Sequence, residues 1–416
     1  MNKSVVIILI LAILTVSVSS CTKDINTAVS ETETESSGTE SSLSESASKD
    51  ESIYSQDDNS SQEPSAEEST AESSTESFAE NSDESSEEGS EESSEESHET
   101  SSESSSESSS ENGSEDPYIF EQEGILIVGN RGMEKFYGSE ASALSYSQCV
   151  QNIKNSLGDS INVYSMVAPH ASVYYAPKAG QYSHLLTVGK NMHDFLKENA
   201  GDSVVYVDVY GALAAHTDED IFFRTEHHWA ALGAYYAAKE FARMAGVDFP
   251  DISEYEEHIK TGFVGSLYSF SGKAQILKDN PDEVAYYVNR EAEYTAYYCY
   301  ENNFDFDNYD FKRNSILFDM ANYAAFLGGD GYGIKIETNN NTGRTLVILK
   351  DSYGNAVVPF LLSSYDTIYV LDFRYFKRNC CDFAREVGAT DVLVIASGFT
   401  ACGTIWKKLE AMRTMD

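Results

Sequence analysis

The chain has few basic residues and no apolar run of membrane-spanning length. Its 28 lysines and arginines stand against 69 aspartates and glutamates, so no basic face is available to neutralise phosphates and nucleic acid is excluded as a partner. The longest apolar run, VVIILILAILTVSV near the N-terminus, has about 14 residues, whereas a membrane helix needs about 20. Residues 1–20 are therefore predicted to be a secretion signal.

Cysteine is also scarce, and its spacing excludes the usual cysteine-rich scaffolds. The six cysteines include no C-x-x-C pair, so neither a disulfide framework nor a zinc ribbon is indicated, although one disulfide remains open in an exported protein. The letters VSSC before Thr22 resemble a lipobox, which predicts that Cys21 is lipidated and anchors the chain to the extracellular face of the cell membrane. The alternative is a plain signal peptide with an incidental cysteine. Cys380 and Cys381 are predicted to be packing residues.

Large apolar side chains are nearly absent from residues 21–116. This segment holds 30 acidic residues, two lysines and many serines, in recurring units such as SSEE and SSESSSESSS. Like-charge repulsion and the lack of buriable surface predict a disordered spacer that reaches on the order of 55 Å. Residues 117–416 then carry only about −14 of the formal charge of −41, which is ordinary for a soluble domain.

From residue 117 the pattern becomes that of an α/β domain. The apolar run 124–130 predicts a buried strand and turn, residues 145–158 predict an amphipathic helix closed by glycine, and residues 161–170 predict the next strand. Strand and helix go on alternating to residue 245, and the alternation returns after residue 342, which favours a parallel sheet flanked by helices. The aromatic-rich stretch of about 251–342 predicts antiparallel strands in an insertion or lid.

A serine lies where a parallel sheet places reacting groups. In LVILKDSYGNAVVPF, residues 346–360, an apolar strand ends at Lys350, Ser352 follows in the turn, and a helix is predicted from about Tyr353. Ligands of such sheets bind beyond the carboxyl ends of the strands. The amide of Ser352 at the start of the helix is a candidate oxyanion donor. Its hydroxyl still needs a general base within hydrogen-bond reach.

The stretch RTEHHW, residues 224–229, offers that base. Side chains at i and i+2 share a face of an extended chain but do not meet on a helix. If the chain turns helical only near Trp229, Glu226 can orient His228 while His228 reaches Ser352. His227 is then predicted to point away from the site.

Two other interpretations of this stretch remain open. Thr225 could cap the helix, with Glu226 in its first turn and the histidines merely surface polar. Both histidines could instead bind a metal ion together with Asp218 or Glu226. The spacing matches no recognised zinc pattern, so we expect neither a metal nor another cofactor.

These two motifs resemble those of a known family. FFRTEHHWAALGAYYAA is similar to the signature of the DHHW proteins of Gram-positive bacteria, which look related to SGNH-hydrolase-like alginate O-acetyltransferase proteins, and ILKDSYGNAVVPFL matches their nucleophile motif. VGNRGMEKFYG, MVAPHASVYYAP and GSLYS also look familiar. The resemblance implies an SGNH-like, circularly permuted fold, with Glu226 as acid, His228 as base and Ser352 as nucleophile. The family's aspartate is a glutamate here, which puts efficient catalysis in doubt.

Three further side chains are candidates for substrate contacts. Arg374 follows the next strand, where a salt bridge to Asp372 is the alternative role. Asn130 ends the first predicted strand and could donate to an oxyanion, although a role in the turn is the alternative. Tyr353, beside the proposed nucleophile, is the third candidate.

The sequence supports two functional hypotheses. The first is a surface-anchored enzyme that transfers or removes an acyl group, expected to be acetyl, at hydroxyls of an envelope or extracellular polysaccharide. The second is a non-catalytic surface protein that keeps the same scaffold to bind a glycan or another partner. The glutamate in place of aspartate and the aromatic insertion, whose rings could stack on sugars, make the second hypothesis credible.

Overall fold

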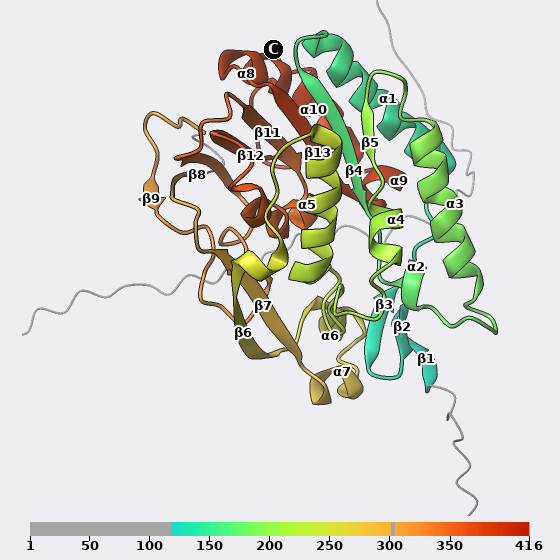
Figure 1. Cartoon of the computed structure of the whole chain (residues 1–416). Helices are drawn as coiled ribbons and strands as arrows, with labels where there is room; N and C mark the ends of the chain where they lie inside the picture. The colour runs from blue at the N-terminus through green and yellow to red at the C-terminus, as the bar shows by residue number, and fades with distance from the viewer. Residues whose placement is uncertain (1–117, 301–303, 416) are drawn as a thin grey trace, which may run out of the picture. The chain divides into compact units, whose positions relative to one another are not determined.

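A mixed eight-stranded sheet forms the centre of the protein, whose computed structural model describes residues 118–300 and 304–415 (Figure 1). Five strands are parallel and three antiparallel strands extend one side. In sheet order the strands are β5 (Val205–Val207), β4 (Asn162–Ala168), β13 (Asp391–Ser397), β11 (Thr345–Lys350), β12 (Thr367–Asp372), β10 (Tyr332–Thr338), β8 (Tyr294–Tyr300) and β9 (Phe311–Arg313). The central strands are apolar runs buried on both faces, as in other helix-covered parallel sheets.

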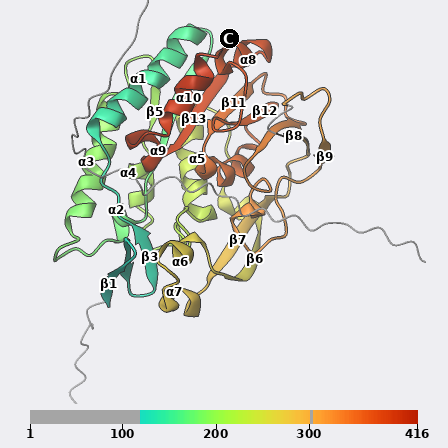
Figure 2. The same ribbon diagram turned by 180° about the vertical axis from the view of Figure 1, so that it is seen from behind.

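Helices cover both faces of this sheet (Figures 1 and 2). One face carries α1 (Glu140–Leu157), α3 (His184–Glu198), α8 (Cys380–Glu386), α9 (Gly398–Cys402) and α10 (Trp406–Arg413), with α2 (Ser172–Tyr175) packed against α3. The other face carries α4 (Val209–Ala214) and α5 (Ala231–Ala245). The sheet therefore separates two apolar cores, one under α1 and one under α5. The α/β class expected from the alternation is confirmed.

Local signals explain where the two long helices begin and end. Ser139 caps α1 by accepting from the Ser142 amide, so the helix starts before the segment in which its amphipathic pattern is clear. Gly158 ends it at a positive φ of 77°. Gly246, at φ 64°, ends α5 in the left-handed αL conformation, which glycine adopts without steric cost.

The first predicted strand does not join the central sheet, which corrects the expected alternation. It is β2 (Ile125–Val128), in a separate antiparallel sheet with β1 (Ile119–Gln122) and β3 (Arg131–Glu134). The reason is the two-residue turn at Gly129 and Asn130, in which Gly129 has a φ of 61°. Such a turn reverses the chain into a hairpin, whereas a parallel neighbour would need a crossover.

The aromatic-rich insertion divides into two parts. Its first part is a two-stranded ribbon, β6 (Tyr255–Phe263) and β7 (Asp282–Asn289), preceded by the short η1 (Ile252–Glu254) and interrupted by α6 (Ser266–Phe270) and α7 (Gln275–Asp279). Its second part contains β8, β9, η2 (Tyr323–Ala325) and β10, and its strands extend the central sheet. The antiparallel strands are thus confirmed, but much of the insertion is core rather than lid. Tyr298 shows this, since it is fully buried against Phe311 and Tyr332.

The chain after β11 differs from the regular helix expected there. It forms two short 3₁₀ helices, η3 (Ser352–Ala356) and η4 (Val358–Leu361), the second with Pro359 in its first turn. Because β11 lies between β12 and β13 in the parallel part, Ser352 stands at the carboxyl edge of the sheet. This edge is where the fold was expected to place a reacting serine.

The cysteines of the described region are all free. They are buried, and the sulfur atoms of Cys380 and Cys381 lie 4.0 Å apart, too far for a disulfide, so the prediction that they are packing residues is confirmed. Cys21, the predicted signal at residues 1–20 and the predicted spacer at 21–116 lie outside the described residues. Among the helices that are described, none has the length and apolar character needed to cross a membrane.

Candidate active site

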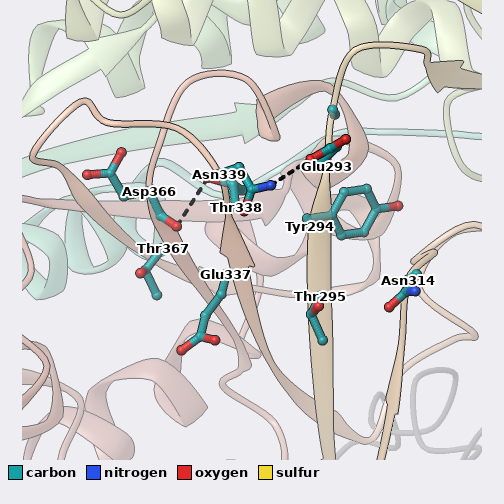
Figure 3. A pocket seen from close by; sticks show the side chains of 10 residues that line it. Glu293, Tyr294, Thr295, Asn314, Glu337, Thr338, Asn339, Asp366 and Thr367 are labelled. Atoms are coloured by element: carbon teal, nitrogen blue, oxygen red, sulfur yellow. Dashed lines mark hydrogen bonds between the residues drawn. The ribbon is translucent and has the colours of Figure 1, made fainter.

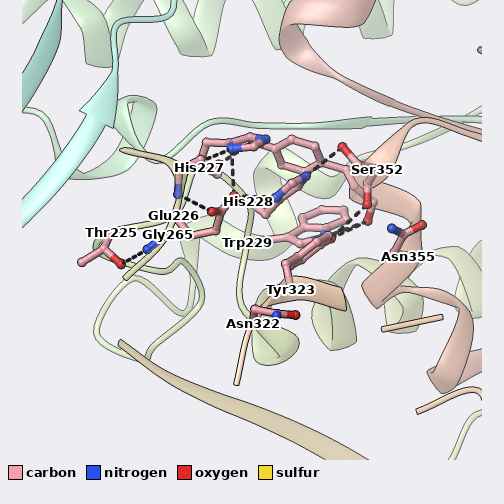
Figure 4. A network of polar contacts seen from close by, with 12 residues as sticks. Thr225, Glu226, His227, His228, Trp229, Gly265, Asn322, Tyr323, Ser352 and Asn355 are labelled. Atoms are coloured by element: carbon pink, nitrogen blue, oxygen red, sulfur yellow. Dashed lines mark hydrogen bonds and ion pairs between the residues drawn. The ribbon is translucent and has the colours of Figure 1, made fainter. Parts of the chain in front are cut away.

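Glu226, His228 and Ser352 meet in one hydrogen-bonded row (Figure 4). Nε2 of His228 lies 2.8 Å from Oγ of Ser352, and Nδ1 of the same ring lies 2.8 Å from Oε1 of Glu226. Both distances are those expected between a nucleophile, its base and the group that orients the base. Glu226 and His228 are each only 6% exposed, so water competes little for these contacts. The structure therefore brings together the three residues that the sequence singled out.

A buried aspartate from the insertion shapes the segment that carries the two histidines. Asp282 accepts hydrogen bonds from the amides of Arg224 and Thr225 and from the Thr225 hydroxyl, at 2.6–2.8 Å. The segment consists of bends closed by a bridge between Phe222 and Trp229, and α5 begins only at residue 231. The interpretation of Thr225 as a helix cap is therefore wrong.

The prediction that His227 points away from the site is also wrong. Nδ1 of His227 lies 2.7 Å from Oε1 of Glu226, the oxygen that also contacts His228, and the two imidazole rings are 3.8 Å apart. The prediction assumed an extended chain, in which successive side chains alternate. The bends imposed through Asp282 turn both rings toward the same carboxylate.

Ser266, the first residue of α6, and Gly265 before it also contact the Glu226 carboxylate. The amide of Ser266 donates to Oε2 of Glu226 at 2.7 Å, and the Ser266 hydroxyl lies 2.5 Å from Nδ1 of His227. A Cβ on Gly265 would come within 2.5 Å of Oε2 and Cβ of Glu226, so only glycine fits there. Both residues lie in the motif GSLYS, which by itself indicated no role for them.

The surroundings of Glu226 and His228 determine their protonation states. Burial alone would raise the pKa of Glu226, but the charge of His227 and the hydrogen bonds from both imidazoles outweigh it and hold that pKa well below the usual value. Burial, followed by the charge of His227, lowers the pKa of His228 to about 4, against the opposing pull of Glu226. At neutral pH the arrangement is thus a carboxylate beside a neutral imidazole, which can accept a proton from Ser352.

The turn that bears Ser352 is held by Asp351. Oδ1 of Asp351 accepts from the Tyr353 amide at 3.1 Å, while Oδ2 accepts from the Ser397 amide and the Thr400 hydroxyl, each at 2.7 Å. Among the described residues, none accepts a hydrogen bond from the Ser352 amide. This amide is therefore available as the oxyanion donor that the sequence suggested.

Aromatic rings from distant parts of the chain enclose the imidazole. Tyr323 of η2 stacks on His228, with ring centroids 3.8 Å apart and an angle of 3° between the planes. Its hydroxyl donates to the Ser352 carbonyl at 3.1 Å. With 27 tyrosines in the chain, composition gave no means to single it out. Tyr353 is only 2% exposed and donates to the His227 carbonyl, so it supports the site from behind rather than facing a substrate.

The other two candidates for substrate contacts have other partners. Arg374 lies in a partly buried charge cluster with Asp330 (2.8 Å) and Asp372 (2.6 Å), which Lys350 completes. The salt bridge weighed as its alternative role is therefore present. Asn130 lies in the hairpin turn of the small sheet and hydrogen-bonds Asn280 at 3.4 Å, so its role there is in the turn.

The side chains of Glu226, His227 and His228 are also of the kinds that bind metal ions. Glu226, His227 and His228 offer three ligand atoms within 4.8 Å of one another. Imidazole nitrogen and carboxylate oxygen are both zinc ligands. Hydrogen bonds among these residues, and to Ser266 and Ser352, already account for each of the three atoms. The geometry is explained without a metal ion.

A polar cleft of about 760 Å³ lies at the other end of the strands (Figure 3). Thr367, at the start of β12, and Glu337 of β10 line it, and Thr367 pairs with Thr345 at the start of β11. The cleft is therefore at the amino edge of the parallel strands, whereas Ser352 is at the carboxyl edge. The cleft and the hydrogen-bonded side chains thus indicate different places for a reaction. We take the hydrogen-bonded side chains as the candidate active site, because a catalytic base must lie within hydrogen-bond reach of the group it deprotonates.

The chain is similar to several known proteins. The sequence matches the DHHW protein family over residues 99–371. A DHHW family protein from Eubacterium siraeum is 36% identical, over 70% of this chain and 96% of that chain, with a TM-score of 0.65. Bacillus cereus PatB1, in a structure with a sulfonyl adduct, is 17% identical over 70% of this chain and 98% of that chain, with a TM-score of 0.55. No curated protein matches.

A further match is more distant. The O-acetyltransferase domain of Pseudomonas putida AlgJ is 12% identical over 71% of this chain and 99% of that chain, with a TM-score of 0.39. The similarity to PatB1 is one of fold, and the expected α/β architecture, a largely parallel sheet flanked by helices, is confirmed. The family match and the 36% identical structure show that this chain belongs to the DHHW family.

Proposed function

We propose that this protein transfers or hydrolyses acyl esters, with Ser352 as nucleophile, His228 as general base and Glu226 as the residue that orients the base. The observation that carries the proposal is the row of two 2.8 Å hydrogen bonds from Glu226 through His228 to the Ser352 hydroxyl. Acyl transfer is the reaction class for which this combination of carboxylate, imidazole and serine recurs on unrelated folds.

The proposed reaction follows from the positions of these atoms. Nε2 of His228 takes the hydroxyl proton as Oγ of Ser352 attacks the ester carbonyl, and the amide of Ser352 donates to the oxyanion that forms. The protonated imidazole then gives its proton to the leaving alkoxide, which departs as an alcohol and leaves an acyl-serine. A second hydroxyl, from a sugar or from water, attacks this acyl-serine with His228 again as base.

The substrate class is proposed from the resemblance of the motifs to a known family. The motifs resemble those of alginate O-acetyltransferase proteins, which favours acetyl as the acyl group and a polysaccharide hydroxyl as the acceptor. Lipid on Cys21 and a spacer at residues 21–116 would hold the domain outside the cell membrane, next to envelope polysaccharide. The reaction as proposed needs no metal or cofactor.

The first experiment asks whether Ser352 is reactive. A fluorophosphonate probe and a chromogenic acetyl ester are applied to the wild type and to Ser352→Ala, His228→Ala and Ser145→Ala. Ser145 is a partly exposed serine whose hydroxyl donates to the Ala141 carbonyl in α1, so its variant is the matched control. We expect labelling and turnover in the wild type and in Ser145→Ala, and loss of both in the other two variants.

A sulfonyl fluoride is a sensible second reagent, because the PatB1 structure carries a sulfonyl adduct. Absence of labelling in the wild type, or equal labelling in Ser352→Ala, would overturn the enzymatic proposal. The scaffold would then be a non-catalytic binding protein, and a pull-down with envelope polysaccharide would be the next measurement.

A further inference from the structure

Two hydrogen bonds tie the segment that bears Ser352 to the segment that bears His228. The hydroxyl of Tyr353 donates to the His227 carbonyl at 2.6 Å, and Nε1 of Trp229 donates to the Tyr353 carbonyl at 3.0 Å. Tyr353 follows the serine in sequence, while the other two residues flank the base. These two hydrogen bonds therefore lie on either side of the 2.8 Å contact between Ser352 and His228. If one segment moved by about 1 Å relative to the other, both bonds would become longer than a normal hydrogen bond.

A buried histidine, His170, which lies just after β4, determines the direction of the hydrogen bond between Tyr353 and the His227 carbonyl. The amide N–H of Phe399 donates to Nε2 of His170 at 3.1 Å, and a backbone N–H can only donate. Nε2 is therefore unprotonated. His170 is only 3% exposed, and burial holds its pKa well below the usual value, so the ring is neutral and its one proton is on Nδ1.

The proton on Nδ1 determines what Tyr353 does. Nδ1 of His170 lies 3.2 Å from the Tyr353 hydroxyl oxygen, which must accept this hydrogen bond. The phenolic proton is then free to point at its other neighbour, the carbonyl of His227. Each hydrogen bond of this chain therefore has a fixed direction. The Phe399 amide donates to His170, His170 donates to the Tyr353 hydroxyl, and that hydroxyl donates to the backbone carbonyl that precedes His228.

The ring of His170 has little room to turn. Phe136 stacks on it at 5.3 Å and Phe399 packs at 4.1 Å. A Cβ on Gly398 would come within 3.0 Å of Cδ2 of the imidazole, so glycine is what allows the ring to lie there. His170 follows β4 and Phe399 belongs to α9 after β13, and the pairing of these two adjacent strands sets the position of the ring.

We propose that His170, in its Nδ1–H tautomer, and Tyr353 are positioning residues that keep the backbone beside His228 in register with Ser352. Neither residue takes part in a proton transfer with substrate. Their effect on rate rests on the function proposed above, whereas the tautomer and the hydrogen bonds do not.

The test compares amide replacements of His170 with removal of the Tyr353 hydroxyl. His170→Asn keeps a donor near the place of Nδ1, and His170→Gln keeps only an acceptor near the place of Nε2. We expect Tyr353→Phe and His170→Gln to lower kcat for the acetyl ester about 10- to 100-fold with little change in KM, because the reacting atoms are displaced. His170→Asn should keep most of the activity, and adding His170→Gln to Tyr353→Phe should cause no further loss.

Histidine ¹⁵N NMR of the full chain supplies a readout that does not need activity. We expect the His170 signals, identified by their loss in His170→Gln, to show a protonated Nδ1 and an unprotonated Nε2. A protonated Nε2, or a Tyr353→Phe variant with the wild-type kcat, would overturn the inference. If the wild type itself is inactive, the proposed function fails and the NMR result alone decides. If His170→Gln does not fold, assignment by Tyr353→Phe replaces it.

Discussion

Nδ1 of His227 lies 2.7 Å from Oε1 of Glu226, so the carboxylate that orients the proposed base is shared with a second imidazole. A shared carboxylate couples the two rings electrostatically. A positive charge on His227 opposes protonation of His228, and it is the second cause of the lowered pKa of His228 after burial. In the proposed mechanism the paired histidines therefore have different tasks: His228 accepts the proton, and His227 sets the pH at which His228 can accept it.

Replacing His227 should move the acid limb of the pH–rate profile. A base works only when unprotonated, so in the wild type kcat/KM should fall as the pH drops through about 4, the pKa of His228. Loss of the neighbouring charge in His227→Asn raises that pKa, and activity should then be lost at a higher pH than in the wild type. Profiles for an uncharged ester measure the shift, with the exposed His184→Asn as control. An unchanged acid limb in His227→Asn would show that His227 has no electrostatic role.

The packing of Gly265 against Glu226 predicts a second effect. Gly265→Ala would place a methyl group 2.5 Å from the carboxylate and so must displace it. We expect kcat/KM to fall about 100-fold, as for other small misplacements of reacting groups, and the free energy of unfolding to fall by about 1–3 kcal/mol. Ser266→Ala keeps the amide that donates to Glu226 and should lose less activity. Wild-type kcat/KM in Gly265→Ala would mean that Glu226 does not need this position.

The glutamate that departs from the family motif fits its surroundings. It reaches His228 with one oxygen and the Ser266 amide with the other, and the space left by Gly265 admits its extra length. Glu226→Asp, although it restores the family residue, should therefore lower kcat/KM about tenfold, because a shorter side chain cannot keep both contacts. Glu226→Gln keeps the length but removes the charge, and should lower kcat by up to about 10⁴-fold. An aspartate variant more active than the wild type would show that the glutamate is a defect.

How far the sequence could predict this site depends on the range of the interactions involved. Ser352 was placed correctly because a buried apolar run and a turn are local signals, and parallel strands share one carboxyl edge. The orientation of His227 was not, because the bends at residues 224–228 depend on Asp282, more than fifty residues away in sequence. No periodicity encodes such a partner.

The same distinction between local signals and long-range contacts explains which parts of the fold could be predicted. Alternating strands and helices gave the parallel part of the sheet. The hairpin at Gly129 and the addition of β8–β10 to the sheet edge depend on turn geometry and on the choice of strand partner. Tyr323 enters the site from this added part, so its contact with His228 was beyond sequence reasoning.

A variant of Arg374 tests whether the partly buried charge cluster serves stability or substrate binding. Its guanidinium pairs with Asp330 and with Asp372, whose side chain is fully buried. Arg374→Ala leaves part of that charge uncompensated, so we expect the free energy of unfolding to fall by about 3 kcal/mol with KM unchanged. Urea unfolding and ester kinetics measure the two quantities, and the exposed Arg243→Ala, whose pair with Glu240 lies at the surface, is the control. A higher KM at unchanged stability would restore Arg374 as a substrate-binding residue.

His193 should make the stability of the domain depend on pH. The ring is 3% exposed, stacks on Tyr210 at 5.3 Å, and neither ring nitrogen has a hydrogen-bond partner among the described residues. Burial lowers its pKa to about 4, below the unfolded value of about 6.5, so protonation favours the unfolded chain and stability is lost as the pH falls from 6.5 toward 4.

The variant His193→Phe keeps a ring of similar shape and removes both unpaired nitrogens. We expect it to raise the free energy of unfolding at pH 7 by about 1 kcal/mol, since no buried polar group is left without a partner. Between pH 7 and pH 4 it should also lose less stability than the wild type, by up to about 3 kcal/mol. His170 and His228 have lowered pKa values as well, so a smaller dependence should remain. Urea unfolding at the two pH values is the measurement, and an equal loss in both proteins would mean that His193 is not buried as a neutral ring.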